Sequence, residues 1–305
     1  MKKPIKPKVL KAGDILAIAA PSSSFEKEPF LRGVEKLKSL GFKVMFQEDI
    51  FATRRYLAGT DERRSQELIG YLTDPSIKAI LTARGGYGAG RILNKLDAAQ
   101  SQFSPKVLLG YSDFTSILNY FGQMLGWVTF QGPCLAKDFD QLSPRGLESL
   151  VQALTSTKPL GEISAPELIT IHPGTAEGIL VGGCLSLITC TLGTPYQINT
   201  QNKILYLEDV GEKPYSIDRM LLQLRQAGLF DELRGIVFGP LKDTHHDLNY
   251  VTDLLKEWVA DLPIPIVFNF PSGHVTDSLT IPFGINTRLN ATKPSLTFLE
   301  GALES

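Results

Sequence analysis

Ser112 is the residue of this sequence best placed to act as a nucleophile. It follows the apolar run Val107 to Leu109 and precedes a stretch with apolar residues at helical spacing. A serine on such a turn between a strand and a helix, a nucleophile elbow, has its hydroxyl beside backbone N–H groups that can stabilise an oxyanion. Phe114 stands where the usual G-x-S-x-G motif has its second glycine. By itself this stretch therefore favours a simpler interpretation, in which Ser112 or Asp113 caps the helix.

A nucleophilic serine needs a base, and the base needs a carboxylate that orients it. His274 lies in the loop that follows the predicted strand 266–268, and Glu208 lies at the end of the apolar run 204–207. Open α/β sheets place functional loops at such carboxyl ends of strands. His274 is equally compatible with a loop histidine that has no catalytic role, and Glu208 with a helix cap or an ion-pair partner. The order serine, acid, histidine does not by itself establish a triad.

The other histidines fit exposed turns. His172 precedes Pro173-Gly174, and His245 and His246 lie in a polar loop. Adjacent residues on an extended chain point apart, so the histidine pair is a poor metal site. We therefore favour a solvated loop over a metal site for this pair.

A glycine-rich loop, residues 84–91, follows the predicted strand 79–83 and opens a helix. Its glycines allow backbone N–H groups to approach a ligand. The loop lacks both the G-x-G-x-x-G fingerprint and the Gly-Lys-Ser/Thr of a P-loop, so nucleotide binding is disfavoured. Gly86 could supply a second oxyanion donor, and a plain tight turn is the simpler alternative.

The elements that must position these residues alternate between strands and helices in the first half of the chain. Strands are predicted near 15–20, 43–47, 77–83, 106–110 and 127–130, with helices near 29–40, 60–73, 89–97 and after Asp113. This alternation with short connections predicts an α/β domain with a parallel sheet, Rossmann-like or flavodoxin-like, covered by helices on both faces.

The stretch 155–161 is the best linker candidate. It suggests an N-terminal α/β domain over residues 1–157 and a smaller C-terminal α/β domain with a mixed sheet over residues 158–305. In the second half, strands are predicted near 168–171, 178–181, 203–208, 235–239, 265–269 and 295–299, with helices near 185–192, 216–227 and 248–260.

Composition excludes several partner classes. The formal net charge is −1, and no lysine and arginine cluster is present, which disfavours nucleic acids and anionic membranes. No run approaches the ~20 apolar residues of a membrane span. Cys134, Cys184 and Cys190 form no C-x-x-C pair, which predicts core thiols, a reducing compartment and hence a cytoplasmic location.

Several stretches together resemble the serine L,D-carboxypeptidase (muramoyltetrapeptide carboxypeptidase) family of peptidoglycan recycling, which includes the microcin C self-immunity peptidases. The resemblance runs over almost the whole chain. It rests on Ala20-Pro21-Ser22-Ser23, Tyr56-Leu57-Ala58-Gly59-Thr60-Asp61-Glu62-Arg63, Arg84-Gly85-Gly86-Tyr87-Gly88, Gly110-Tyr111-Ser112-Asp113, Leu207-Glu208-Asp209-Val210-Gly211-Glu212, Tyr215, Ile217-Asp218-Arg219-Met220-Leu221 and Gly273-His274.

The resemblance implies a hydrolase with Ser112 as nucleophile, His274 as base and Glu208 as the acid that orients the base. It also implies oxyanion donors from the backbone of Gly86 and Asp113, a site between two domains, a homodimer, and no cofactor or metal. Two positions depart from the family as we picture it. They are Cys184, which replaces a common asparagine, and Gln131, which replaces a common histidine.

These features predict a serine carboxypeptidase that releases the terminal D-alanine of muropeptide tetrapeptides in cell-wall recycling. A bidentate arginine is an economical ligand for the free carboxylate of such a substrate, and Arg84, Arg91 and Arg219 are the candidates. One alternative is a microcin C-type peptidase that cleaves an aminoacyl-nucleotide analogue. As we picture the family, peptidases of that kind are longer and carry an aromatic-bearing insertion near the site. This chain is short and its two tryptophans lie within predicted secondary structure, which disfavours that alternative. The other alternative is a two-lobed protein that binds a small ligand without chemistry.

Overall fold

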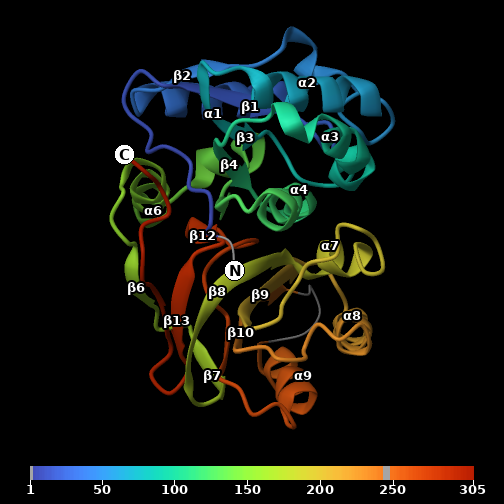
Figure 1. Cartoon of the computed structure of the whole chain (residues 1–305), viewed down its shortest axis with the longest axis vertical. Coiled ribbons are helices and arrows are strands. Elements are labelled where there is room, and N and C mark those ends of the chain that lie inside the picture. Colours follow the sequence, from blue (N-terminus) through green and yellow to red (C-terminus); the bar gives the residue numbers. More distant parts are fainter. Residues whose placement is uncertain (1–2, 243–247) are drawn as a thin grey trace.

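Two sheets, each flanked by helices, form the framework of the chain (Figure 1). The computed structural model describes residues 3–242 and 248–305. The first sheet has six strands in the order β12-β5-β4-β3-β1-β2, and the second has eight in the order β6-β14-β13-β8-β9-β10-β11-β7.

The strands of the first half confirm the predicted alternation. They are β1 (Ile15–Ala19), β2 (Lys43–Met45), β3 (Ile77–Thr82), β4 (Val107–Gly110) and β5 (Thr129–Gln131). The helices between and after them are α1 (Lys27–Ser39), α2 (Asp61–Thr73), α3 (Leu93–Ala99), α4 (Thr115–Tyr120), α5 (Leu135–Asp138) and α6 (Pro144–Thr155). Short 3-10 turns cover 48–51, 89–92, 100–102, 112–114 and 139–141, and a π-helical turn covers 121–125.

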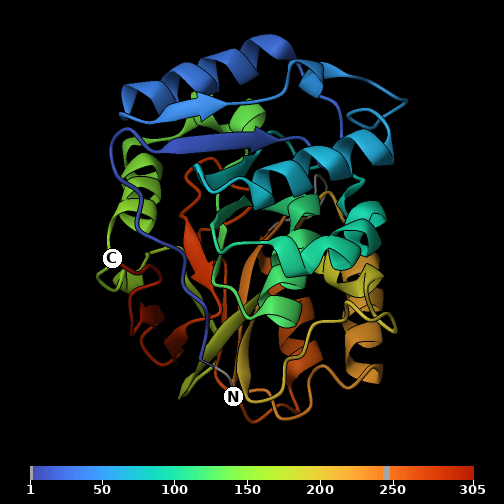
Figure 2. The same ribbon diagram turned by 45° about the horizontal axis from the view of Figure 1, so that its top comes forward.

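Side-chain alternation along β1 explains why helices cover both faces of the first sheet. Leu16 and Ile18 pack into a cluster with α1, α5 and α6. Ala17 and Ala19 face the opposite cluster, which contains residues of α2, α3 and α4. The turned view in Figure 2 separates α1 and α2 on either side of the sheet.

The first sheet differs from the prediction in its sixth strand. Five strands run parallel as expected, but β12 (Ile281–Phe283) comes from the second half of the chain and pairs antiparallel with β5. This strand is only three residues long and contains Pro282, which edge strands tolerate. Neither its length nor its pattern identifies it in the sequence.

The second sheet is mixed, as predicted. Its strands are β6 (Gly161–Ser164), β7 (Ile169–His172), β8 (Thr175–Cys184), β9 (Lys203–Val210), β10 (Gly235–Lys242), β11 (Ile266–Phe268), β13 (Asn286–Asn290) and β14 (Ser295–Phe298). Strands β8 to β11 are parallel to their neighbours in that group, and the remaining pairings are antiparallel. The helices α7 (Leu185–Cys190), α8 (Pro214–Gln226) and α9 (Leu248–Val259) pack into one apolar cluster with β9 and β10.

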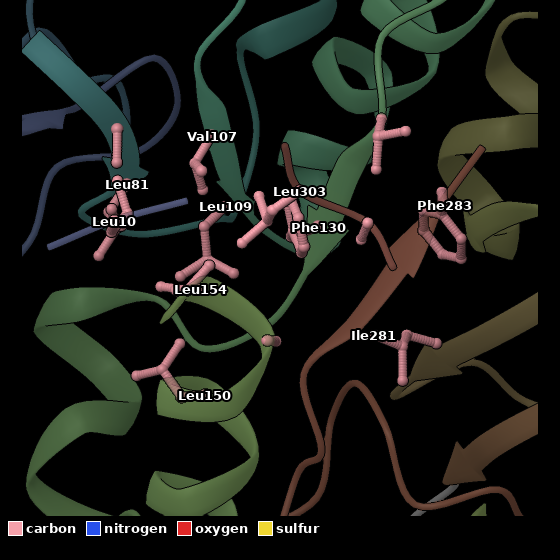
Figure 3. Packing of buried hydrophobic residues seen from close by; sticks show 14 of the residues in the cluster. Leu10, Leu81, Val107, Leu109, Phe130, Leu150, Leu154, Ile281, Phe283 and Leu303 are labelled. Carbon is pink, nitrogen blue, oxygen red and sulfur yellow. The ribbon is translucent and has the colours of Figure 1, made fainter. Parts of the chain in front are cut away.

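An apolar cluster joins the two halves. Figure 3 shows Leu109 of the first sheet next to Leu154 of α6, and Phe130 of β5 between them and the side chains of Ile281 and Phe283 on β12. Strand β12 lies in the second half of the chain but pairs with β5, so the chain returns to the first sheet after residue 158. The proposed division at residues 157 and 158 falls between α6 and β6 and stays a prediction.

None of the helices in the described part of the chain is long and apolar enough to cross a membrane.

Candidate active site

The turn that carries Ser112 has the strand, turn and helix order expected of a nucleophile elbow. Strand β4 ends at Gly110, and Ser112 begins a short 3-10 helix that continues into α4. Ser112 has φ +59°, a conformation that costs a non-glycine residue of order 1–3 kcal/mol. The absence of a side chain at Gly85 leaves room for this turn, because a Cβ atom there would lie only 2.9 Å from the Ser112 hydroxyl oxygen.

Glu208 and His274 form a buried pair. The Oε2 atom of Glu208 lies 2.6 Å from Nδ1 of His274 and also accepts the backbone N–H of His274 at 3.2 Å. The Glu208 side chain is 0% exposed and that of His274 is 5% exposed. The carboxylate therefore fixes both the ring and the backbone of the histidine. Glu208 lies inside β9, two residues before its end, rather than at the end of the strand.

Glycine and a buried tyrosine bring the His274 loop close to Glu208. Gly273 has φ +99°, and a Cβ atom there would collide with the Glu208 carboxylate. The Tyr206 hydroxyl donates to the carbonyl oxygen of Ser272 at 2.5 Å. The Gly273 N–H donates to the Ser278 hydroxyl at 2.9 Å.

Neighbours of Ser112 connect its turn to the Glu208–His274 pair. The ring of Tyr111 contacts the imidazole of His274, with centroids 4.7 Å apart. Thr115 Oγ1 accepts the backbone N–H of Cys184 at 3.1 Å, and Cys184 is the β8 partner of Glu208. The three residues predicted from sequence thus lie around one place at the junction of the two sheets.

The contact between the Ser112 turn and His274 runs through the ring of Tyr111. Among the described residues, none of the hydrogen bonds joins the Ser112 hydroxyl to the imidazole. In the absence of substrate, the hydrogen bond between a nucleophile and its base is often long in enzymes and tightens only when substrate binds.

Burial dominates the electrostatics of the site. It raises the pKa of Glu208, against the opposing effect of the hydrogen bond from His274. Burial likewise raises the pKa of the Asp113 carboxyl and of the Cys184 thiol. The Cys184 thiol lies 3.5 Å from a carboxylate oxygen of Asp209, which adds to the rise in the thiol pKa.

The glycine-rich loop is held against the Ser112 turn. Gly86 has φ +96°, and a Cβ atom there would collide with the Ser23 hydroxyl. That hydroxyl accepts the backbone N–H of Tyr87 at 3.1 Å. A carboxylate oxygen of Asp113 accepts the backbone N–H of Ala89 at 2.7 Å.

The three candidate arginines lie in different surroundings. Arg84 is exposed and donates to the carbonyl oxygen of Ser24 at 2.6 Å. Arg91 is bound to the carboxylate of Asp61, with Nη2 at 2.7 Å. Arg219 lies on α8, exposed, over the ring of Tyr215. Of the three, Arg84 combines a place in the glycine-rich loop with a guanidinium that has no carboxylate partner among the described residues.

Other sequence expectations need correction. His172 ends strand β7, pairs with Ile266 and is half-buried, instead of lying in an exposed turn. Cys134 and Cys184 are buried as expected, but Cys190 at the end of α7 is exposed.

His245 and His246 lie outside the described residues. Within the described ranges no group of three or more histidine, cysteine, aspartate or glutamate residues is arranged to hold a metal.

Sequence reasoning missed the residues that support the pair. Tyr111, Tyr206 and Ser272 contact or hold the His274 loop, but each is a common residue type within an apolar run or a loop. Only the position of Tyr111 directly before Ser112 offered a signal.

Two family models match the chain. The model described as the LD-carboxypeptidase N-terminal domain matches residues 16–132, and the one described as the LD-carboxypeptidase C-terminal domain matches residues 177–289. The turn that carries Ser112 falls inside the first match, and the strand that carries Glu208 falls inside the second.

Individual relatives are similar over nearly the full length. A probable murein peptide carboxypeptidase of Bacillus subtilis is 34% identical over 98% of this chain and 96% of its own. A crystal structure of an MccF-like protein from Bacillus anthracis has a TM-score of 0.88 and 29% identity, over 97% of this chain and 99% of its own. A crystal structure of a muramoyltetrapeptide carboxypeptidase from Oxalobacter formigenes has a TM-score of 0.82 and 29% identity, over 95% of this chain and 100% of its own. The chain therefore belongs to the LD-carboxypeptidase family.

Proposed function

We propose that this protein is a serine carboxypeptidase that hydrolyses the L,D-peptide bond before the terminal D-alanine of a muropeptide tetrapeptide. One observation carries the proposal: the buried Glu208–His274 pair lies beside the strained Ser112 turn. The similarity to the murein peptide and muramoyltetrapeptide carboxypeptidases supports the choice of substrate.

The proposed reaction begins at Ser112. Its hydroxyl oxygen attacks the carbonyl carbon of the L-residue while Nε2 of His274 takes the hydroxyl proton. Glu208 holds the opposite ring nitrogen and stabilises the imidazolium that forms. Its burial supports this role, because a carboxylate acts more strongly on a neighbouring charge where water is excluded.

The oxyanion that forms would be held by two backbone N–H groups, those of Gly86 and Asp113. Asp113 lies in the first turn of a helix, where N–H groups have no acceptor within the helix. When the tetrahedral intermediate collapses, His274 gives its proton to the leaving amine of D-alanine. Water then attacks the acyl-enzyme, and His274 acts as base once more.

The free carboxylate of the leaving residue needs a cationic partner. We assign this role to Arg84, because it lies in the glycine-rich loop and is available to a ligand. Arg219 is the second candidate, and its contacts are with Tyr215 and Ser216 on its own helix.

Product analysis tests the proposed reaction. The protein is incubated with a muropeptide tetrapeptide that ends in D-alanine, with its L-alanine analogue and with the C-terminal amide. Mass spectrometry should show release of D-alanine, release from the L-analogue slower by about 10–200-fold, and almost none from the amide. Activity should persist in excess chelator. Internal cleavage, equal turnover of amide and acid, or inactivation by chelator would contradict the proposal.

A second candidate is hydrolysis of an aminoacyl-nucleotide analogue, because an MccF-like protein is among the structural neighbours and MccF itself has been solved in complex with aspartyl sulfamoyl adenosine. The same incubation with an aspartyl sulfamoyl adenosine decides between the two, since turnover of this compound and not of the tetrapeptide would favour the second. Labelling of Ser112 by a fluorophosphonate distinguishes either enzyme from a two-lobed binding protein, in which the serine would stay unlabelled.

We further propose that the protein acts in the cytoplasm and forms a homodimer. Fractionation of cells and sedimentation of the purified protein test these two points.

A further inference from the structure

Arg64 of helix α2 is among the largest fully buried side chains, at 0% exposure. Arginine is almost never fully buried unless its charge is paired. A buried charge of this kind is costly to desolvate, and the proposed triad does not use it. Its surroundings therefore call for an explanation.

The partners of Arg64 belong to two loops beside the Ser112 turn. Nη1 donates to the carbonyl oxygens of Pro21 and of Gly88, the latter at 2.7 Å. Nη2 donates to the carboxylate of Asp61, one turn away on the same helix. One guanidinium thus ties the loop after β1 to the glycine-rich loop.

The glycine-rich loop is shaped to receive this guanidinium. Gly88 has φ +134°, and a Cβ atom there would lie 2.7 Å from Arg64 Nη1. The next residue, Ala89, donates its N–H to the Asp113 carboxylate. Arg64 and Asp113 therefore fix the loop at two adjacent residues, the second and third after Gly86.

We propose that Arg64 is a positioning residue for the oxyanion hole, an inference that rests on the proposed function. By holding the carbonyl of Gly88, it sets the place of the Gly86 N–H opposite Ser112. A displacement of about 1 Å at such a donor can cost 10²-fold in rate. Arg64 itself touches neither the substrate nor the reacting atoms.

Two variants test the proposal from both sides of the contact. Arg64→Lys keeps the charge but cannot reach both carbonyls and Asp61 with a fixed fork, and Gly88→Ala displaces the guanidinium. Gly90→Ala is the control for an added methyl group in this loop, because a Cβ atom at Gly90 meets nothing within 4 Å, and Arg64→Lys tests the contact without the backbone strain that alanine adds at Gly88. For each variant kcat, KM, the rate of fluorophosphonate labelling at Ser112 and thermal melting are measured.

We expect kcat and the labelling rate of both test variants to fall about 10–100-fold, with KM within about threefold of wild type, since the loss concerns the transition state alone. Gly90→Ala should match wild type. Unchanged kcat in a folded Arg64→Lys, a rise in KM alone, or an equal loss in Gly90→Ala would overturn the proposal. Failure of both test variants to fold would assign Arg64 to the core alone and overturn it too.

The failure of the proposed function gives a different result. If wild type releases no D-alanine but is labelled at Ser112, the choice of substrate is wrong, and the labelling rates of the variants still decide the role of Arg64. If wild type is neither active nor labelled, both proposals are wrong.

Discussion

Glu208 accepts two hydrogen bonds from His274 through one oxygen, Oε2: from the ring nitrogen Nδ1 at 2.6 Å and from the backbone N–H at 3.2 Å. This double contact fixes the direction of the imidazole ring relative to its own main chain. It leaves Nε2 as the ring nitrogen available to the Ser112 hydroxyl. A residue that only balanced charge would not need the backbone contact.

Glu208→Gln should therefore fold but react slowly. An amide of the same shape can favour the wrong histidine tautomer, and the loss in kcat should be about 10²–10⁴-fold. Ser112→Ala and His274→Ala should each lower kcat at least as much as Glu208→Gln. A variant that combines Ser112→Ala with His274→Ala should be no slower than the slower of these two single variants, because the residues act as a unit. Steady-state kinetics and circular dichroism measure both effects. Additive losses would show that the residues act independently.

Gly86→Ala should lower kcat by about 10²–10³-fold, the usual cost of one lost oxyanion donor. The positive φ of Gly86 and the contact with Ser23 mean that alanine also strains the loop, by about 1–3 kcal/mol. Kinetics and chemical unfolding are measured together, with Gly90→Ala as the control. A variant with full activity would show that Gly86 serves the turn alone.

The sequence predicted the elements that repeat a strong local pattern. The strands of the first half and helix α2, whose Thr60 hydroxyl accepts the Arg63 N–H as an N-cap, follow from apolar spacing and capping residues. Strand β12 did not, because its pairing with β5 joins residues about 150 positions apart and leaves no local trace. Long-range pairing is decided by packing, which spacing does not encode.

The site was predicted in the same uneven way. Ser112 and His274 follow predicted strands, Glu208 ends one, and the resemblance to a family singled them out. The supports could not be found, since the Tyr206–Ser272 bond and the Tyr111–His274 contact join residues whose types are also common in ordinary cores. Arg64 shows why local sequence is not enough: an arginine on an isolated helix is expected to be exposed, and only the tertiary structure buries this one.

Glu67 should make the stability of the protein depend on pH. Burial raises its pKa from 4.5 to about 7, although Arg63 and the Ala20 N–H act in the opposite direction. Between these two values the folded state holds a proton that the unfolded state releases, so the free energy of unfolding falls as pH rises through this window. Relative to Glu67→Gln, wild type should lose up to about 3 kcal/mol between pH 4 and pH 8.

Urea unfolding of both proteins at several pH values measures this difference. Glu62→Gln on the same helix is the control, because the pKa of the exposed Glu62 is lowered by Lys95 and its titration lies below the window. A constant difference between wild type and Glu67→Gln from pH 4 to pH 8 would contradict the prediction.

Arg84→Met should weaken recognition of the free C-terminal carboxylate. A lost charge-assisted hydrogen bond of about 1.5–3 kcal/mol corresponds to a drop in kcat/KM of about 10–150-fold on the tetrapeptide. The C-terminal amide lacks the carboxylate, so its residual turnover should not change. Arg219→Met is the matched comparison: it removes an exposed arginine over Tyr215 and should leave kcat/KM near wild type if Arg84 alone binds the carboxylate. The reverse pattern, with the loss in Arg219→Met, would move the carboxylate site to α8, and an equal loss on acid and amide would show that Arg84 only supports the loop through Ser24.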